Sequence, residues 1–240
     1  MKLVIVRHGD PDYVNDCLTE TGKREVELLS ERMKNVKADE CYCSPLRRAQ
    51  QTAAPCLAKM NMKAEELQWL REFAPKVQRP EKEGVAWDWV PSDWTSMPYA
   101  FDFDRWTEYP AFEDAHVREE IDWIYSEFDQ FLRKHGYEKD GKLFRAAAPN
   151  NDTIVFFCHF GLECVLLSYL LNLPPLVMWH SMIAAPTSIT TVVTEERREG
   201  IAQFRMTAFG DTSHLYVAGQ EPSFSGRFRE CFTNENERMD

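Results

Sequence analysis

The sequence has too few basic residues for a protein that binds nucleic acid or anionic membranes non-specifically. Lysine and arginine number 28 against 39 aspartate and glutamate residues, and the formal net charge is −11. A surface of this sign repels phosphate backbones and acidic headgroups. Nucleic acid and membranes are therefore not expected partners, although a single site could still carry the positive charge that a small anion requires.

Long apolar runs and paired cysteines are also lacking. The apolar run at residues 3–6 is shorter than the core of a signal peptide and is followed at once by Arg7. No other stretch is long enough to cross a membrane. The seven cysteines are an odd number without the spacing of a disulfide framework. We therefore expect a cytoplasmic protein whose thiols are free.

Short apolar runs alternate with amphipathic segments along the chain. The apolar runs are typical of buried strands, and the amphipathic segments are typical of helices. A last pair of apolar runs predicts two late strands. Ser44 and Pro45 predict the start of the second helix, with Ser44 as its N-cap. The alternation predicts one domain over residues 1–240, a three-layer α/β/α sandwich around a central, mostly parallel sheet. The predicted strands are 3–6, 40–43, 67–70, 153–158, 188–193 and 201–207, and the predicted helices are 18–36, 44–60, 113–135 and 162–171.

Residues 73–112 interrupt this alternation. They hold five of the 13 prolines and four of the seven tryptophans and show no helical or strand period. Forty such residues are too many for an ordinary connection, so we expect a lid or cap insertion. Its aromatic side chains form either a small satellite core or the apolar wall of a substrate pocket.

Chemically active side chains follow three predicted strands directly. Arg7 and His8 follow the first strand, Arg48 lies just beyond the second, and His159 follows the strand at 153–158. Parallel strands end at one edge of a sheet, where ligands bind. Arginine holds two phosphate oxygens at once, and a neutral imidazole can attack phosphorus when its other nitrogen is held as a donor. The convergence predicts phosphoryl transfer, which also needs an acid for the leaving group.

The tripeptide Arg7-His8-Gly9 after an apolar strand resembles the signature of the histidine phosphatase superfamily, the phosphoglycerate-mutase-like enzymes. Three further segments match in the same order, at residues 18–22, 44–53 and 157–161. The resemblance implies a phosphoglycerate-mutase-like fold and a metal-independent phosphomonoesterase without a cofactor. Its partner would be a small-molecule phosphate ester.

The resemblance also implies a role for each matching residue. His8 would be the phosphorylated nucleophile, and Arg7, Arg48 and His159 would complete the phosphate pocket. Glu72 falls where many members carry the general acid.

Several positions depart from the family pattern or compete for a role. Asp10, two residues from His8, is a rival general acid, and Asn15 is displaced by one residue from the family's asparagine. Phe160 replaces a common glycine and would narrow the pocket. His214 follows the last strand and either reaches the rim or serves in packing.

Three alternatives remain beside the phosphatase. A phosphoglycerate-type phosphomutase would return the phosphoryl group to a second hydroxyl, but the segments typical of the cofactor-dependent mutases are absent. A non-catalytic phosphate-binding protein would keep the basic pocket without turnover. A metal hydrolase would use His8 and His159 as ligands, but no carboxylate-rich set with recognisable spacing accompanies them, so no metal is expected.

Overall fold

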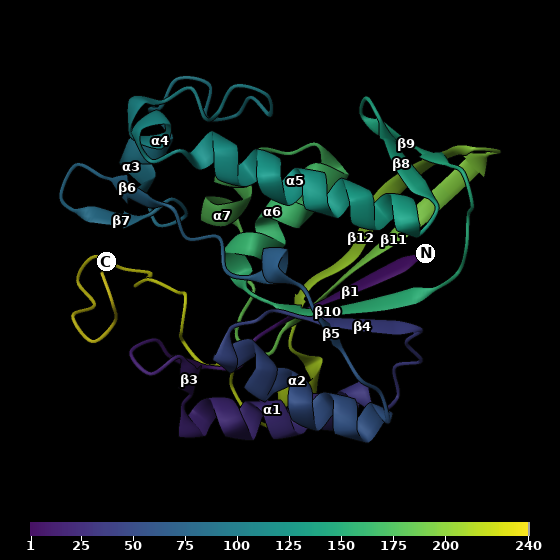
Figure 1. Cartoon of the computed structure of the whole chain (residues 1–240). Coiled ribbons are helices and arrows are strands. Elements are labelled where there is room, and N and C mark those ends of the chain that lie inside the picture. The colour runs from purple at the N-terminus through teal and green to yellow at the C-terminus, as the bar shows by residue number, and fades with distance from the viewer. Residues whose placement is uncertain (240) are drawn as a thin grey trace.

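The structure is a computed structural model that describes residues 1–239. Its middle layer is an eight-stranded mixed sheet (Figure 1). Along the order given next, the first four strands pair in parallel. From the fourth strand to the eighth, each neighbouring pair is antiparallel. The order is β5 (Glu65–Glu66), β4 (Glu40–Cys43), β10 (Thr153–Cys158), β1 (Lys2–Arg7), β11 (Ile189–Arg198), β12 (Ile201–Asp211), β9 (Leu143–Ala146) and β8 (Tyr137–Asp140).

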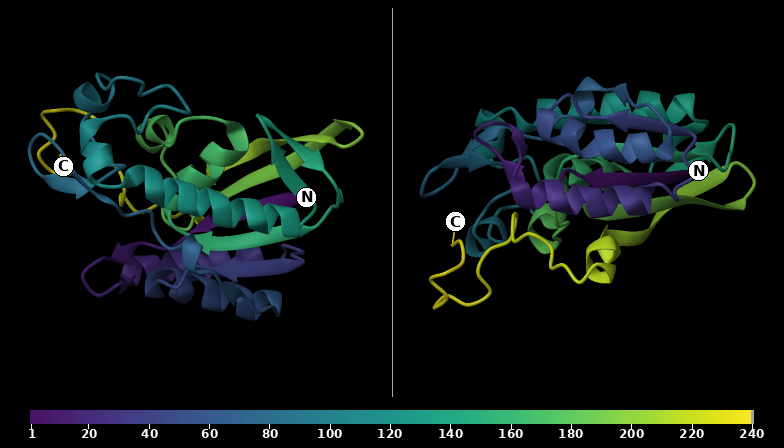
Figure 2. Two further views of the ribbon diagram at one scale, coloured as in Figure 1. Left: turned by 45° about the horizontal axis from the view of Figure 1, so that its top comes forward. Right: turned by 90° about the horizontal axis from the view of Figure 1, so that it is seen from below.

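Helices cover both faces of the sheet. In Figures 1 and 2, α1 (Glu20–Met33) and α2 (Arg47–Met60) lie on one face, and α5 (Val117–Lys134), α6 (Phe160–Leu171) and α7 (Pro175–Ser181) lie on the other. The pleat of β1 separates the two cores, because Val4 and Val6 pack in the α1–α2 cluster and Leu3 and Ile5 in the larger one. The predicted α/β sandwich is confirmed.

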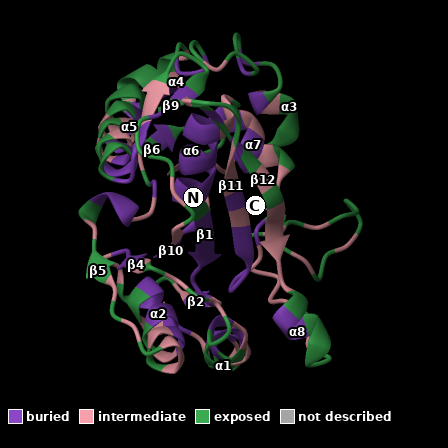
Figure 3. Cartoon of the chain, turned by 90° about the vertical axis from the view of Figure 1, so that its right-hand side faces the viewer, coloured by how far each residue is buried: buried purple, intermediate pink, exposed green. Residues whose placement is uncertain are grey.

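The central parts of this sandwich are the most deeply buried. Figure 3 shows β1 and α6 as buried ribbons, whereas α8 (Ser213–Val217) carries exposed residues at the periphery. Ten of the twelve residues of α6 are buried, which explains why its sequence is apolar on every side. Within residues 1–239, no helix combines the length and apolarity needed to cross a membrane.

The expected strand at 67–70 is wrong. Residues Gln68–Leu70 form a 3₁₀ turn, in which the N–H of Leu70 donates to the carbonyl oxygen of Leu67 at 3.0 Å. Trp69 and Leu70 are both buried, whereas a strand would turn neighbouring side chains to opposite faces. The edge strand β5 lies just before this turn.

The second helix begins two residues later than predicted. Its N-cap is Leu46, and no side chain caps it. Ser44 lies before the helix because its hydroxyl oxygen serves two other groups, the N–H of Leu46 at 3.2 Å and a ring nitrogen of His159. Thr19, in contrast, caps α1 and accepts a hydrogen bond from the N–H of Gly22 at 3.0 Å.

The predicted helix at 113–135 is two helices. α4 (Pro110–Asp114) ends before His116, whose φ of 52° is left-handed, and α5 then runs to Lys134. A left-handed residue cannot continue a right-handed helix, so the break is local.

Residues 73–112 contain a hairpin and short helical turns rather than an irregular loop. The hairpin pairs β6 (Lys76–Gln78) with β7 (Glu83–Val85), and α3 (Pro91–Trp94) follows. Trp106 packs edge-on against Trp179 of α7, with ring centroids 5.5 Å apart. The buried aromatic residues of this stretch thus belong to the main core, and a separate satellite core is not formed.

The chain after α8 lies at the end of the molecule where β1 finishes. Figures 1 and 2 show this segment, in yellow, beside the hairpin of β2 (Pro11–Asp12) and β3 (Cys17–Leu18) and beside the β6–β7 hairpin. Three segments far apart in the sequence therefore surround the same edge of the sheet.

Candidate active site

The parallel strands bring two histidines together at their carboxyl ends. His8 follows β1 and His159 follows β10, and these two strands are neighbours in register. The ring centroids of the two histidines are 5.0 Å apart, and both residues are almost completely buried. The two histidines that the sequence places at strand ends therefore lie in one site at the edge of the sheet.

The ring of His8 is held in one orientation by its own backbone neighbour. Nδ1 lies 2.8 Å from the carbonyl oxygen of Gly9. A carbonyl oxygen only accepts, so Nδ1 carries the proton and Nε2 keeps its lone pair. Burial first, and then the charges of Arg7 and Arg48, lower the pKa of His8 well below its usual value. The ring is neutral at physiological pH, which is the form that can attack phosphorus.

Two guanidinium groups supply positive charge around His8. Nε of Arg48 lies 3.3 Å from Nε2 of His8, and Nη1 of Arg48 forms an ion pair with Asp16 at 2.5 Å. Arg7 donates from Nη1 to the carbonyl oxygen of Ala184, and its Nε has no hydrogen-bond partner among residues 1–239. Both side chains are buried and remain charged, so the site attracts an anion. The neighbouring Arg47 is exposed.

His159 has one engaged and one available ring nitrogen. Its Nε2 lies 2.7 Å from the hydroxyl oxygen of Ser44, and its Nδ1 has no partner within the described chain. Burial, followed by the proximity of His8, Arg48 and Arg7, lowers the pKa of His159 well below its usual value. The site therefore holds two neutral imidazoles.

Glu72 brings a carboxyl group to the same place. One oxygen, Oε1, accepts from the backbone N–H groups of Phe73 at 2.9 Å and Leu162 at 3.1 Å. Burial raises the pKa of Glu72, and the charges of Arg48 and Arg7 oppose this rise. A glycine at position 161 is required for this contact, because a Cβ there would lie 2.7 Å from Oε1.

His8, Glu72 and His159 also have the geometry of a metal triad. One ligand atom from each lies within 4.8 Å of the others. His8 Nδ1, His159 Nε2 and Glu72 Oε1 already have protein partners. The atoms left over are the same ones that a bound phosphate ester would use.

The rival acid, Asp10, lies outside this cluster. Its carboxylate accepts from the hydroxyl of Thr19 at 2.6 Å, and from the hydroxyls of Ser223 and Ser225. Three donors thus hold this carboxylate at the junction between the β2–β3 hairpin and the C-terminal segment.

Asn15 and His214 do not join the cluster either. Asn15 is exposed and donates from Nδ2 to Asp12 at 2.7 Å. His214 is buried behind the site, with Nε2 3.1 Å from the hydroxyl of Thr187, whose N–H donates to the carbonyl oxygen of His8. Burial lowers the pKa of His214 to about 4.

Phe160 lies between Arg7 and Trp87. Its ring faces the guanidinium of Arg7, at 5.6 Å from the centroid, and lies edge-on to Trp87 at 6.3 Å. Trp87, from the 73–112 stretch, also lies against Gly161, two residues after His159.

Sequence reasoning missed several residues at this site. It did not pair Ser44 with His159 or Asp16 with Arg48, and it assigned nothing to the C-terminal segment. The pairing of Asp16 could have been predicted, because Asp16 is an acidic residue in the loop before α1 and α2 begins with two arginines. The serines of the C-terminal segment carried none.

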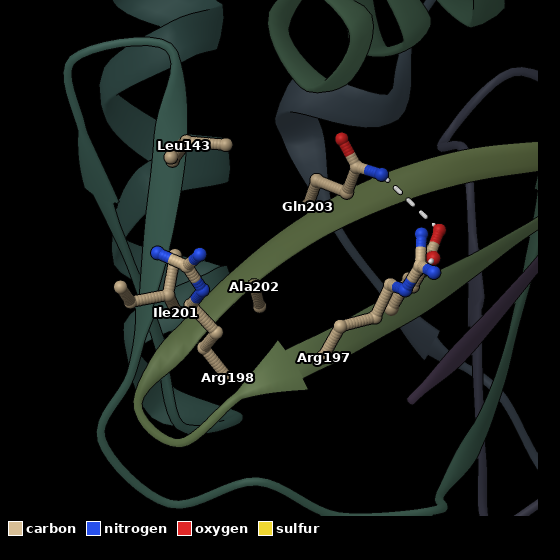
Figure 4. A pocket seen from close by; sticks show the side chains of 7 residues that line it. Leu143, Arg197, Arg198, Ile201, Ala202 and Gln203 are labelled. Carbon is tan, nitrogen blue, oxygen red and sulfur yellow. Dashed lines mark hydrogen bonds and ion pairs between the residues drawn. The ribbon is translucent and has the colours of Figure 1, made fainter.

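A surface groove of about 460 Å³ lies outside this site. Figure 4 shows it at the β11–β12 turn, where Gln203 donates to Glu195. That turn lies beyond the amino-terminal end of β1, since Lys2 pairs with Val193 and the strands run antiparallel. The groove is lined by Leu143, Glu195, Arg197, Arg198, Ile201, Ala202 and Gln203, a set without a nucleophile.

A neutral, oriented imidazole beside two buried arginines, a second imidazole and a carboxyl group defines a phosphoryl-transfer site. The sequence profile of the histidine phosphatase superfamily (branch 1) matches residues 3–207, so the chain belongs to this superfamily. It is a phosphatase that hydrolyses phosphate monoesters.

Individual relatives are distant. Phosphoserine phosphatase 1 of Hydrogenobacter thermophilus is 23% identical over 219 residues, covering 86% of this chain and 93% of that protein. A probable phosphatase of Schizosaccharomyces pombe is 33% identical over 66 residues, or 24% of this chain, and the match spans 32% of the yeast protein.

Solved structures show the same fold. A mutant phosphoserine phosphatase of Entamoeba histolytica in complex with phosphoserine has a TM-score of 0.59 and 21% identity, and the match covers 89% of this chain and 98% of that one. The structure of phosphoserine phosphatase from the same organism with 3-phosphoglyceric acid gives a TM-score of 0.58 and 20% identity, with the same coverage.

Proposed function

We propose that this phosphatase hydrolyses a small phosphorylated metabolite through a phosphohistidine formed on Nε2 of His8. The observation that carries the proposal is the 2.8 Å contact between Nδ1 of His8 and the carbonyl oxygen of Gly9. It leaves the lone pair of the buried ring on the nitrogen nearest Arg48.

The phosphoryl group would bind between the arginines. Arg7 and Arg48 offer planar, permanently charged donors to the non-bridging oxygens. His159 would add a hydrogen bond from Nδ1, with Nε2 accepting from the hydroxyl of Ser44. In a buried site these donors stabilise the charge that spreads over the transferring group.

The reaction then takes two steps. In the first, Nε2 of His8 forms a bond to phosphorus while the ester P–O bond breaks, and the leaving oxygen takes a proton. In the second, water attacks the phosphohistidine and gives up a proton, the P–N bond breaks, and inorganic phosphate leaves with His8 neutral again. No metal takes part in either step.

Glu72 is the proton donor and acceptor in this scheme. Burial raises its pKa, which favours the protonated form that a general acid requires. Oε1 accepts two backbone hydrogen bonds, so the transferable proton resides on Oε2. Asp10 is a poorer candidate because its carboxylate already accepts three hydroxyl groups.

The surroundings of the site support a small substrate. Relatives carry names and ligands such as phosphoserine and 3-phosphoglyceric acid, all small phosphorylated molecules. We propose that residues 73–112 cap the substrate, with Trp87 beside Phe160 and Gly161 at the site. The seven cysteines are all free thiols, which supports action in a reducing cytoplasm.

The test combines activity with detection of the intermediate. Purified enzyme should release phosphate from p-nitrophenyl phosphate, and enzyme quenched in base during turnover should carry an acid-labile phosphate located on His8 by mass spectrometry. His8→Ala should lose both signals, whereas His116→Gln, at an exposed position on α5's N-terminus, should keep them. A His8→Ala enzyme with substantial turnover would overturn the covalent route.

A further inference from the structure

The C-terminal segment is attached to the loop that follows His8. The hydroxyls of Ser223 and Ser225 both donate to Oδ1 of Asp10. The N–H of Ser223 also donates to Oε1 of the buried Glu25 at 2.7 Å. These contacts hold residues 223–225 at the rim of the site.

The next residue touches the phosphate-binding machinery itself. A Cβ at Gly226 would lie 3.1 Å from Nη1 and 3.3 Å from Nη2 of Arg7, and the φ of Gly226 is +86°. Both the left-handed backbone and the close approach favour glycine here. The segment therefore runs directly against the guanidinium of Arg7.

A cavity of about 370 Å³ opens between this segment and the β2–β3 hairpin. Gly226 lies in its wall and contacts Arg7, and Tyr13 lies in its wall with its ring 5.5 Å from the guanidinium of Arg48. The cavity thus adjoins both phosphate-binding arginines. Its lining residues are Asp10, Tyr13, Ser223, Phe224, Ser225, Gly226, Arg227 and Arg238.

Two further guanidinium groups, those of Arg227 and Arg238, line this cavity. Arg227 pairs with Glu230 at 2.9 Å, and Arg238 lies 3.5 Å from Asp88. The two arginine side chains are 39% and 44% exposed, so these ion pairs are weak and can be exchanged for a ligand at small cost. A chain of net charge −11 thus has two arginines in the wall of this cavity, and Arg7 and Arg48 lie against two other residues of the wall, Gly226 and Tyr13.

We propose that this cavity binds the non-phosphate end of the substrate and that Arg227 and Arg238 bind a carboxylate there. The proposal rests on the proposed function, because it places the phosphoryl group on Arg7 and Arg48. Arginine engages a carboxylate through two parallel hydrogen bonds. A carboxylate fits better than a second phosphate, because Asp10 in the same wall would repel a dianion more strongly than a monoanion.

The proposal predicts discrimination between two substrates that differ only in the carboxylate. Phosphoserine and phosphoethanolamine form such a pair, and 3-phosphoglycerate and glycerol 3-phosphate form a second. Wild-type enzyme should prefer the carboxylated member by about tenfold or more in kcat/KM, since charge-assisted hydrogen bonds are worth that factor. In Arg227→Gln/Arg238→Gln the preference should fall to near unity, through a rise in KM for the carboxylated member.

The matched control is Arg229→Gln. Arg229 belongs to the same segment but lies over the ring of Phe232, at 4.4 Å, and does not line the cavity. This variant should keep the wild-type preference and melting temperature. An alkyl bisphosphate without a carboxylate serves as a further arm, and a preference for it over phosphoserine would assign the cavity to a second phosphate instead.

Two failures are distinguishable. If wild-type enzyme hydrolyses p-nitrophenyl phosphate but treats both members of each pair alike, or if the double variant loses activity equally on both, the carboxylate subsite is wrong and the phosphatase stands. If wild-type enzyme releases phosphate from none of these esters, the proposed function fails and the subsite fails with it.

Discussion

The hydroxyl of Ser44 lies 2.7 Å from Nε2 of His159, although the two residues are 115 positions apart in the chain. The contact joins the ends of β4 and β10, which are paired in parallel. It orients the second imidazole and determines which of its nitrogens faces the site.

Loss of this contact should weaken catalysis without unfolding the protein. Ser44→Ala removes the partner of a buried ring nitrogen, and we expect kcat/KM to fall by about tenfold. Ser44→Thr keeps a hydroxyl and should recover part of the activity. Steady-state kinetics on p-nitrophenyl phosphate measure this change in kcat/KM. Thermal melting of the variants is the control for folding. Wild-type activity in Ser44→Ala would show that His159 is positioned by its backbone alone.

The general acid should reveal itself through the leaving group. Glu72→Gln should reduce kcat/KM for an alkyl phosphate by about 10²–10⁴-fold, because an alkoxide needs a proton to depart. p-Nitrophenyl phosphate releases p-nitrophenolate, a stable anion, so its kcat/KM should fall far less. Asp10→Asn is the paired variant, and the same leaving-group dependence in that variant instead would reassign the acid to Asp10. Equal losses on both esters would make Glu72 a binding residue.

Activity should withstand removal of metal ions. Arg7 and Arg48 already supply the positive charge that a metal would bring to the phosphoryl group. We therefore expect full turnover after exhaustive dialysis against EDTA, and competitive inhibition by vanadate, which mimics the transferring group. Collapse of turnover in EDTA and its return with added zinc, manganese or magnesium would instead assign His8, Glu72 and His159 to a metal.

Glu163 should make the protein less stable as pH rises. It is 1% exposed in α6, and burial raises the pKa of this carboxyl to about 7 from 4.5, with the Thr190 hydroxyl and Arg7 opposing the rise. The folded state then binds the proton more tightly than the unfolded state. The contribution of Glu163 to the free energy of unfolding is therefore constant below pH 4.5, falls as pH rises to about 7, and is constant again above that.

Glu163→Gln removes this titration. The difference in melting temperature, variant minus wild type, should become more positive from pH 5 to pH 8. The wild-type protein should lose about 3 kcal/mol of unfolding free energy over this titration, and the variant should not. Differential scanning calorimetry of both proteins at both pH values measures this difference. A difference of constant size for Glu163→Gln would contradict the raised pKa.

Local patterns in the sequence were sufficient for the centre of the fold. The apolar runs at 3–6 and 153–158 are strands β1 and β10, and Arg7, His8 and His159 are placed by being adjacent to them. Adjacency of this kind needs no long-range information, because parallel strands end at a common edge. Arg48 was assigned to the site from the resemblance to the family motif, not from adjacency to a strand.

Local patterns failed where a tertiary contact competed with the local preference. Ser44-Pro45 has the features of a helix start, yet the Ser44 hydroxyl bonds His159 and the helix begins at Arg47. Residues 67–70 have the apolar character of a strand, yet Trp69 and Leu70 turn to the same core. In both cases a tertiary contact was stronger than the local preference.

By itself, the sequence determined the α/β class, the parallel strands that end at the site and the four residues Arg7, His8, Arg48 and His159 that meet there. Tertiary structure alone decided what surrounds them. The contact of Ser223 with Asp10 spans 213 positions, and the close approach of Gly226 to Arg7 is just as remote in the chain. Contacts at that separation follow from the packing of the whole molecule around the sheet, because no local preference of a serine or a glycine specifies a partner so far away.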